Sequence, residues 1–204
     1  MTIETALTFL LASGLLALAP GPDNLFVLSQ AMLYGRWAGI YITLGLCTGL
    51  LVHTSAVVLG VVTLFQRSGM LLALKAVGAL YLLYIAWKTF RAKPMPLGHS
   101  SSAMTAGALY RRGIVMNVTN PKVAIFFLAF LPQFVQAERG SMALQLIQLG
   151  GLFMLTALLV FSGIAFLAGT LGEKIKSNQS LQRWLNYLVA TVLVALAARL
   201  LVWD

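Results

Sequence analysis

Six long apolar stretches, separated by short polar gaps, fill almost the whole chain. They cover residues 3–32, 39–65, 69–90, 113–134, 143–171 and 185–202. Each is close to the ~20 mainly apolar residues that an α-helix needs to cross a bilayer. Only 9% of the 204 residues are charged and 60% are hydrophobic, which leaves no room for a soluble domain. We therefore predict an all-α polytopic membrane protein of about six transmembrane helices.

The gap at residues 91–112 is the longest, and its Pro, Gly and Ser residues favour an irregular loop. It divides a single transporter-like domain, residues 1–204, into two three-helix halves, residues 1–90 and 113–204. Three spans in each half require that any structural repeat be inverted, as is common in transporters. When the halves are aligned on their prolines, Pro22 falls on Pro121 and Asp23 on Lys122. This short match predicts a 3+3 inverted repeat with broken first and fourth helices.

The distribution of Lys and Arg predicts the orientation, because cytoplasmic loops attract the excess of basic residues. Nine of the 14 basic residues lie in gaps on one side and four on the other, while Lys122 lies within a span. This places the loop at 91–112 in the cytoplasm and both termini on the outer face. The last span is short, so five spans stay an alternative. The net charge is +9, and its basic residues lie between the apolar runs and not on one face. This distribution indicates contact with a lipid bilayer and no nucleic acid.

Two prolines interrupt the first span in the motif Pro20-Gly21-Pro22-Asp23-Asn24. Each proline lacks an N–H and clashes with a preceding carbonyl, and Gly21 adds backbone freedom. The helix must therefore break near the bilayer midplane, where Asp23 could cap the half-helix that follows. Irregular backbone at this depth is tolerated only against protein or a water-filled cavity. The motif predicts a transport site, and the alternative is a kinked helix with a capping aspartate and no substrate.

A second break, Asn120-Pro121-Lys122, lies in the fourth span. Asp23 is the sole carboxylate deep inside a predicted span, and an isolated charge there costs ~3 kcal/mol or more, so Lys122 is its natural partner. We predict that Asp23, Asn24, Asn120 and Lys122 bind substrate. The carboxylate would hold the ammonium of a zwitterion, while the lysine and the half-helix N-termini would hold its carboxylate. The alternative is a permanent salt bridge with a structural role.

His53 lies in the middle of the second span. It is a candidate proton relay, because the pKa of free imidazole, ~6.5, lets histidine change charge at physiological pH. The alternative is a neutral histidine that is hydrogen-bonded inside the helix bundle. The same span contains glycines at spacings that favour close helix packing, namely Gly39, Gly45, Gly49 and Gly60.

Several classes of function are disfavoured by what the chain lacks. It has one cysteine and two histidines, with no cluster of metal-ligand spacing and no GxxxxGK[ST] phosphate loop. We expect no metal, no cofactor and no ATP hydrolysis. One buried carboxylate cannot form an aspartyl dyad, and one cysteine cannot form a thiol relay, so we expect no enzyme activity. A six-span carrier or channel for another small solute or cation remains the alternative to an amino-acid carrier.

Taken together, these motifs closely resemble the LysE/RhtB family of amino-acid exporters over nearly the whole chain. The most specific element is Asn120-Pro121-Lys122 with the aromatic run that follows it as far as Phe134. The resemblance implies a multi-pass protein of the bacterial inner membrane that exports amino acids or close derivatives by antiport. It also implies the proton motive force as the driving force and protons as the coupling ion. The exported amino acid, the stoichiometry and a homo-oligomeric state stay open, although one deep carboxylate favours a neutral substrate over a dibasic one.

Overall fold

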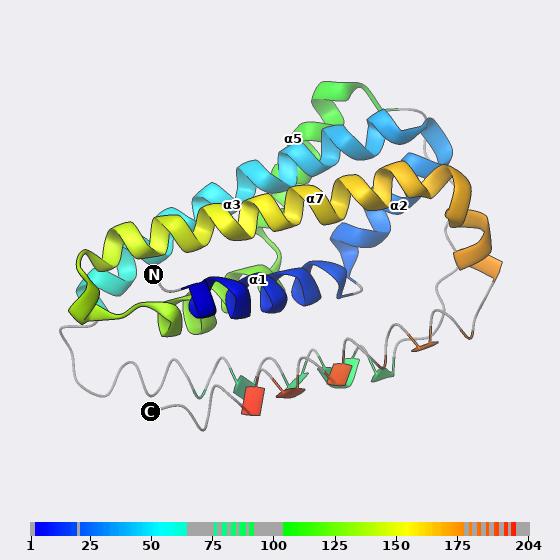
Figure 1. The fold of residues 1–204 in the computed structure, drawn as a ribbon. Coiled ribbons are helices and arrows are strands. Elements are labelled where there is room, and N and C mark those ends of the chain that lie inside the picture. Colours follow the sequence, from blue (N-terminus) through cyan, green and yellow to red (C-terminus); the bar gives the residue numbers. More distant parts are fainter. Residues whose placement is uncertain are drawn as a thin grey trace.

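The computed structural model describes residues 3–19, 21–64 and 104–177 continuously, together with scattered residues between 76 and 91 and between 180 and 198. All elements in these ranges are helical, and none is a strand (Figure 1). In chain order they are α1 (Ile3–Leu18), α2 (Pro22–Tyr34), α3 (Arg36–Leu64), α5 (Ala106–Val118), α6 (Pro121–Ile125), η1 (Phe126–Phe130), η2 (Leu131–Phe134), η3 (Ala137–Arg139) and α7 (Met142–Ser177). The all-α prediction is confirmed. The predicted third and sixth spans lie largely outside the described residues.

Two long helices and two bent helix pairs account for the predicted spans that the structure describes. In α3 and α7, Arg36–Gly60 and Met142–Ala168 are each long and apolar enough to cross a membrane. The helices α1 and α2 meet at 62°, and α5 meets the helical segment 121–134 at 49°. By length and composition, each bent pair qualifies as one broken span. The long helices lie side by side, and α5 packs against α3 (Figure 1).

Both breaks fall at the predicted prolines. The half-helices α2 and α6 begin at Pro22 and Pro121, where a missing N–H costs no intrahelical hydrogen bond. The start of α5 differs from the prediction, because it lies at Ala106, inside the segment expected to be loop. Thr105 caps this helix, since its hydroxyl accepts from Ala108 N at 3.3 Å. The cap explains why the helix begins well before the apolar run.

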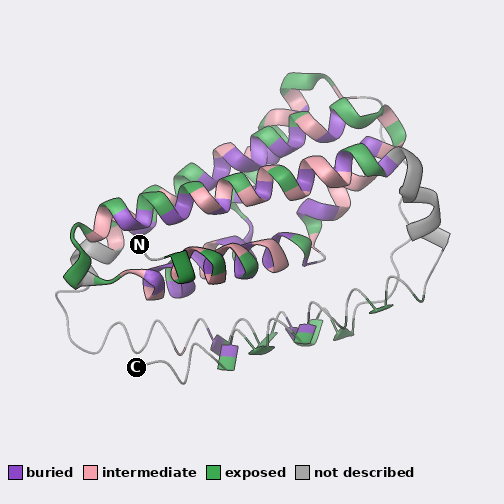
Figure 2. Cartoon of the chain, viewed as in Figure 1, coloured by how far each residue is buried: buried purple, intermediate pink, exposed green. Residues whose placement is uncertain are grey.

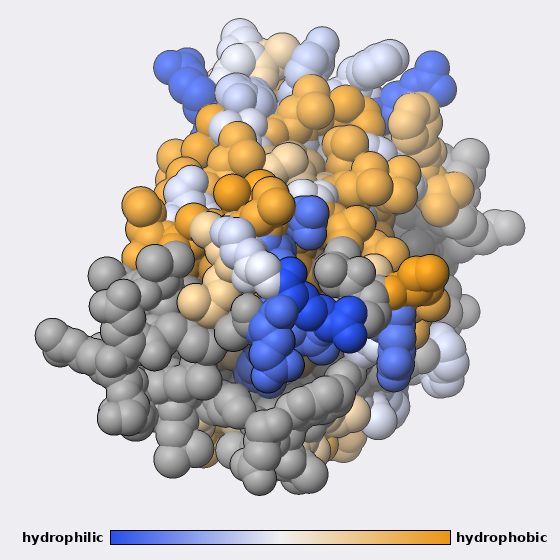
Figure 3. All heavy atoms as spheres, turned by 60° about the vertical axis from the view of Figure 1, so that its left-hand side comes forward, coloured by the Kyte–Doolittle hydropathy of each residue, from blue (hydrophilic) through white to orange (hydrophobic). Residues whose placement is uncertain are grey.

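Large apolar side chains point away from the bundle on every long helix. Leu11 of α1 is 69% exposed, Leu59 of α3 is 74% exposed and Leu159 of α7 is 66% exposed. Figure 2 shows exposed positions alternating with buried ones along α3 and α7, and Figure 3 shows apolar side chains covering much of one face. Such a surface is unfavourable in water and suits hydrocarbon. The fold is therefore that of a membrane protein.

Glycines bring the backbones of α3 and α5 into direct contact. A Cβ atom added to Gly45 would strike the carbonyl oxygen of Tyr110, and one added to Gly113 would strike that of Ile42. At Gly49 an added Cβ would lie 2.7 Å from Asn117 Cβ. The predicted packing role is confirmed for Gly45 and Gly49, and for Gly39, whose Cβ would lie 2.7 Å from that of Ala165. At Gly60 an added Cβ would meet no atom of the described residues within 4 Å, so the packing role is not supported there.

Candidate functional site

The two helix breaks meet at a buried hydrogen bond. Asn120 Nδ2 donates to Asp23 Oδ2 at 2.7 Å, which joins the first turn of α2 to the start of α6. Both side chains are almost completely buried, with Asp23 1% and Asn120 4% exposed. Two residues that lie 97 positions apart in the sequence, one from each motif, are therefore in direct contact.

Asn120 has a second role as the cap of α6. Its Oδ1 accepts from the backbone N–H of Lys122 at 3.0 Å, so one amide side chain fixes a helix start and holds Asp23. The expectation that Asp23 caps α2 is wrong. Gly21 occupies the cap position and makes no side-chain hydrogen bond, because Pro22 starts the helix and places Asp23 one position further along. A carboxylate in the first turn still interacts favourably with the helix dipole.

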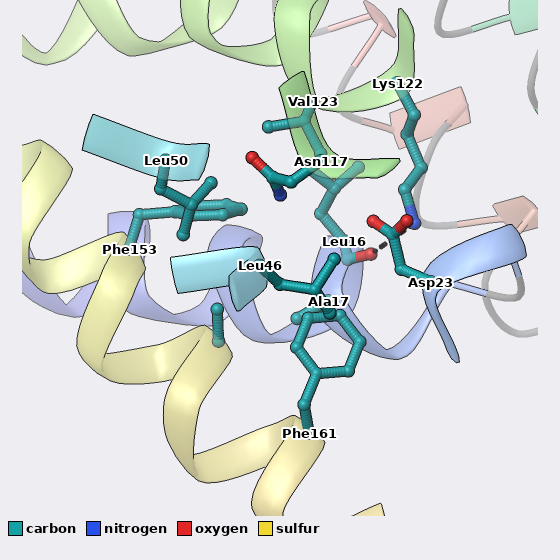
Figure 4. Close-up of a pocket in the computed structure, with 11 residues that line it drawn as sticks. Leu16, Ala17, Asp23, Leu46, Leu50, Asn117, Lys122, Val123, Phe153 and Phe161 are labelled. Atoms are coloured by element: carbon teal, nitrogen blue, oxygen red, sulfur yellow. Dashed lines mark hydrogen bonds between the residues drawn. The ribbon is translucent and has the colours of Figure 1, made fainter. Parts of the chain in front are cut away.

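Lys122 does not pair directly with Asp23, although both side chains point toward the same spot in Figure 4. Its Nζ donates to Leu16 O at 3.3 Å and to Ala19 O at 3.1 Å. The residue four positions after Leu16 is Pro20, which has no N–H to donate. Leu16 O also accepts from Ala19 N at 3.2 Å, so the lysine is a second donor to a carbonyl that lacks its regular helical one. A direct salt bridge, the alternative considered for this pair, is absent between these two described residues.

Asn24 also binds the end of α1. Its Nδ2 donates to Ala17 O at 2.7 Å, and its side chain is 9% exposed. Asn24 and Lys122 together satisfy three carbonyls where α1 stops, those of Leu16, Ala17 and Ala19. The predicted site residue Asn24 therefore lies at the break, with its amide directed to backbone.

A small cavity lies between the two breaks (Figure 4). Its volume of about 10 Å³ gives room for about one water molecule. The polar side chains that line it are those of Asp23, Asn117 and Lys122, and the apolar ones belong to Leu16, Ala17, Leu46, Leu50, Val123, Phe153, Ala157 and Phe161. Asp23 Oδ1 and Asn117 Oδ1 are buried and accept no hydrogen bond from any described residue. Such unpaired atoms cost ~1–3 kcal/mol each, so they point to a ligand.

Asn117 and the apolar wall were missing from the predicted site residues. The signal for Asn117 was its position one turn before Pro121, and its side chain is only 2% exposed. The wall residues Leu46, Leu50 and Phe153 lie on long, uniformly apolar helices, where the sequence does not distinguish inward from outward faces. Within the described ranges, no group of three or more His, Cys, Asp or Glu residues could hold a metal ion.

His53 does not line the cavity, but it contacts the lining residue Asn117. Its Nε2 donates to Asn117 O at 3.0 Å, and the side chain is 8% exposed. The residue four positions after Asn117 is Pro121, so this carbonyl lacks its regular helical donor and accepts instead from Asn120 N at 2.9 Å and from His53. His53 therefore does for the second break what Lys122 does for the first. The geometry matches the hydrogen-bonded bundle histidine, and the relay stays a prediction.

Phenylalanine rings pack against one side of the site. Residues 126–130 form a π-helix, a rare conformation that occurs frequently at functional sites. The ring centroid of Phe126 lies 5.3 Å from that of Phe153 and 6.2 Å from that of Phe9. Phe134 meets Phe9 edge-on at 5.1 Å. These rings join α1, α7 and the segment after the second break, so the site cannot widen on this side unless they separate.

Comparison with known proteins identifies relatives over most of the chain. The family model described as LysE type translocator matches residues 15–203. A homoserine/homoserine lactone efflux protein of Salmonella typhimurium is 34% identical over 186 residues, which are 89% of each chain. An uncharacterized membrane protein of Vibrio cholerae is 30% identical over 90% of each chain, and a leucine efflux protein of an Enterobacter species is 26% identical over 95% of this chain and 93% of its own. No solved structure matches the chain.

Proposed function

The chain belongs to the LysE type translocator family, and from this premise we propose that it exports amino acids or close derivatives across the bacterial inner membrane. The export is antiport driven by the proton motive force, and the protein is a carrier, not an enzyme. The observation that carries the proposal is the Asn120–Asp23 hydrogen bond, which unites two helix breaks around a buried carboxylate. Transporters with broken helices bind their substrates at such breaks.

The chemistry of the cavity suits a zwitterion with a neutral side chain. Asp23 Oδ1 supports an ammonium site, because it is buried without a hydrogen-bond partner among the described residues. Lys122 supplies the positive charge for a carboxylate, and Asn117 Oδ1 is a further acceptor. The wall formed by Leu46, Leu50 and Phe153 suits an aliphatic chain. The names of the relatives, homoserine and leucine efflux proteins, support the same substrate class.

Everted membrane vesicles test this function, because export then appears as uptake into the vesicle. We expect labelled homoserine or leucine to accumulate only when a proton gradient is imposed, and labelled lysine to accumulate less. Vesicles without the protein and vesicles with Asp23→Asn serve as controls. If no amino acid accumulates above the control, the proposed function is wrong. Accumulation that survives a protonophore would contradict proton coupling.

Orientation is predicted from the basic residues and can be tested at two exposed positions. In a Cys47→Ser background, Glu138→Cys lies between the second half's broken span and α7, and Gly107→Cys lies at the start of α5. A Cβ at Gly107 would meet nothing within 4 Å, so this cysteine is tolerated. We expect an impermeant thiol reagent to label position 138 in intact cells and position 107 only after permeabilisation. The reverse pattern would contradict the orientation.

His53 allows the structural and the relay roles to be separated. Glutamine at this position keeps an N–H donor for Asn117 O but cannot titrate, whereas alanine loses both properties. We expect His53→Gln to retain wild-type yield and to lose at least tenfold in gradient-driven export between pH 6 and 8. His53→Ala should also unfold at a lower temperature, because Asn117 O then keeps only its hydrogen bond from Asn120 N, and a lost hydrogen bond costs ~0.5–1.5 kcal/mol. If His53→Gln exports at the wild-type rate, His53 has only the structural role.

A further inference from the structure

The ammonium of Lys122 occupies a position that is suited to any small cation with N–H donors. Leu16 O and Ala19 O, its two acceptors, lie where α1 stops. The carboxyl end of a helix carries roughly half a negative charge, and broken-helix transporters use such ends and unwound carbonyls to coordinate a coupling cation. A Cβ at Gly21 would lie 3.2 Å from Nζ, so glycine leaves the room that the ammonium fills.

Asp23 supplies an independent observation at the same place. Its Oδ1 is buried, lines the cavity together with Lys122, and accepts no hydrogen bond from the described residues. An ammonium group has three N–H donors, and Lys122 uses two of them on backbone carbonyls. The two carbonyl oxygens and the unpaired Asp23 Oδ1 thus offer three acceptors, which is the number of donors on a free α-ammonium, whereas Lys122 itself bonds only the two carbonyls.

We propose that Leu16 O and Ala19 O, together with Asp23 Oδ1 at the same cavity, form an ammonium-binding subsite, and that Lys122 occupies its two carbonyls when no substrate is bound. In the loaded carrier the α-ammonium of the exported amino acid takes this subsite, and the displaced lysine pairs with the substrate carboxylate. The identity of the loaded-state occupant rests on the proposed function. The scheme keeps the buried charges balanced in both states, since a zwitterion adds no net charge to Asp23 and Lys122. The empty carrier thus closes over its own ammonium and needs no metal cation.

Two variants of Lys122 remove the ammonium together with different lengths of side chain, so the size of the cation that replaces it tests the subsite. Lys122→Met keeps a side chain of nearly the same length without the terminal nitrogen, and Lys122→Ala removes the chain beyond Cβ. For the purified full-length protein, we expect ammonium chloride to raise the thermal midpoint of Lys122→Met by several degrees relative to sodium chloride. Propylammonium should do the same for Lys122→Ala and should not help Lys122→Met, because the methionine fills that space. The wild type should respond equally to all these salts.

Tetramethylammonium is the matched control, since it carries the same charge and has no N–H donor. Equal stabilisation by sodium, tetramethylammonium and ammonium would overturn the subsite. If a variant does not fold in sodium salts, its recovery when purified in the matching ammonium salt is the readout, and failure of both variants to recover overturns the proposal. The exported amino acid should compete with ammonium for Lys122→Met, and its hydroxy-acid analogue should not. An ammonium response in a protein that exports no amino acid would support the subsite and contradict the proposed function.

Discussion

Replacing Gly45 by alanine is expected to lower the thermal midpoint of the protein and to reduce export at least tenfold. The new Cβ would strike the backbone carbonyl of Tyr110, so α3 and α5 must move apart. Overpacking of this kind costs ~1–3 kcal/mol and occasionally more, which outweighs the ~1 kcal/mol that alanine gains over glycine in a helix. Export should fall because α5 carries Asn117, and the side chain of Asn117 packs against Gly49 of α3. Fluorescence-detected unfolding in detergent and vesicle transport measure the two effects.

Gly60→Ala is the matched control, because it makes the same change on the same helix where an added Cβ meets nothing within 4 Å. Its midpoint should equal or exceed that of the wild type. Gly113→Ala should resemble Gly45→Ala, since its Cβ would strike Ile42 O from the opposite side of the contact. The double variant should cost less than the sum of the two, because one separation of the helices relieves both clashes. Equal midpoints for Gly45→Ala and Gly60→Ala would contradict the close contact.

The sequence predicts the positions of the helix breaks well because they have local causes. A proline lacks its own N–H and clashes with the preceding turn whatever surrounds it, so Pro22 and Pro121 mark the starts of α2 and α6. The apolar runs that became α3 and α7 are long enough to predict without knowledge of their neighbours. Thr105 shows the limit of apolar patterning, because its cap extends α5 into the segment predicted as loop.

The partners of the charged residues depend on tertiary contacts, and the sequence does not specify them. The sequence predicts that Asp23 pairs with Lys122, because these are the two charged residues deep inside predicted spans. In the structure, the hydrogen-bond partner of Asp23 is Asn120, whose Nδ2 donates to the carboxylate and whose Oδ1 caps the start of α6. The motif explains why Leu16 O and Asn117 O lack their regular helical donor. Each keeps a hydrogen bond from the backbone three residues further on, and its second donor comes from another helix.

The small size of the cavity has a consequence for transport. A space for about one water molecule does not admit an amino acid, so this cavity must widen before it can hold one. The two halves of the chain are in direct contact here. Asp23 of α2 contacts Asn120, and Phe9 of α1 contacts Phe126 and Phe134. Substrate entry must therefore separate some of these contacts. A ligand achieves this only if it binds the widened state more tightly than the narrow one. In the proposed function, a zwitterion that pairs with Asp23 and Lys122 would supply that difference.

The largest effect on export is expected from removing either buried charge. Asp23→Asn keeps the shape of the side chain and an acceptor for Asn120 Nδ2, but it leaves Lys122 without its neighbouring negative charge. Lys122→Met leaves the Asp23 carboxylate buried and uncompensated. Leaving either buried charge uncompensated costs up to ~3–5 kcal/mol, which is the cost of breaking a direct buried pair, so each variant should lower membrane yield and should export at the level of control vesicles. Arg139→Met removes an exposed positive charge and is the matched control, with yield and export expected at wild-type levels.

The double variant Asp23→Asn with Lys122→Met separates stability from function. It removes both buried charges, so yield and thermal midpoint should recover toward the wild-type values. Export should nevertheless stay absent, because the ammonium and the carboxylate of a zwitterion both lose their charged partners. A pair with only a structural role would behave differently, since neutralising both members would restore export together with folding. Vesicle transport by the refolded double variant at wild-type rates, or by either single variant, would therefore show that Asp23 and Lys122 do not bind the substrate.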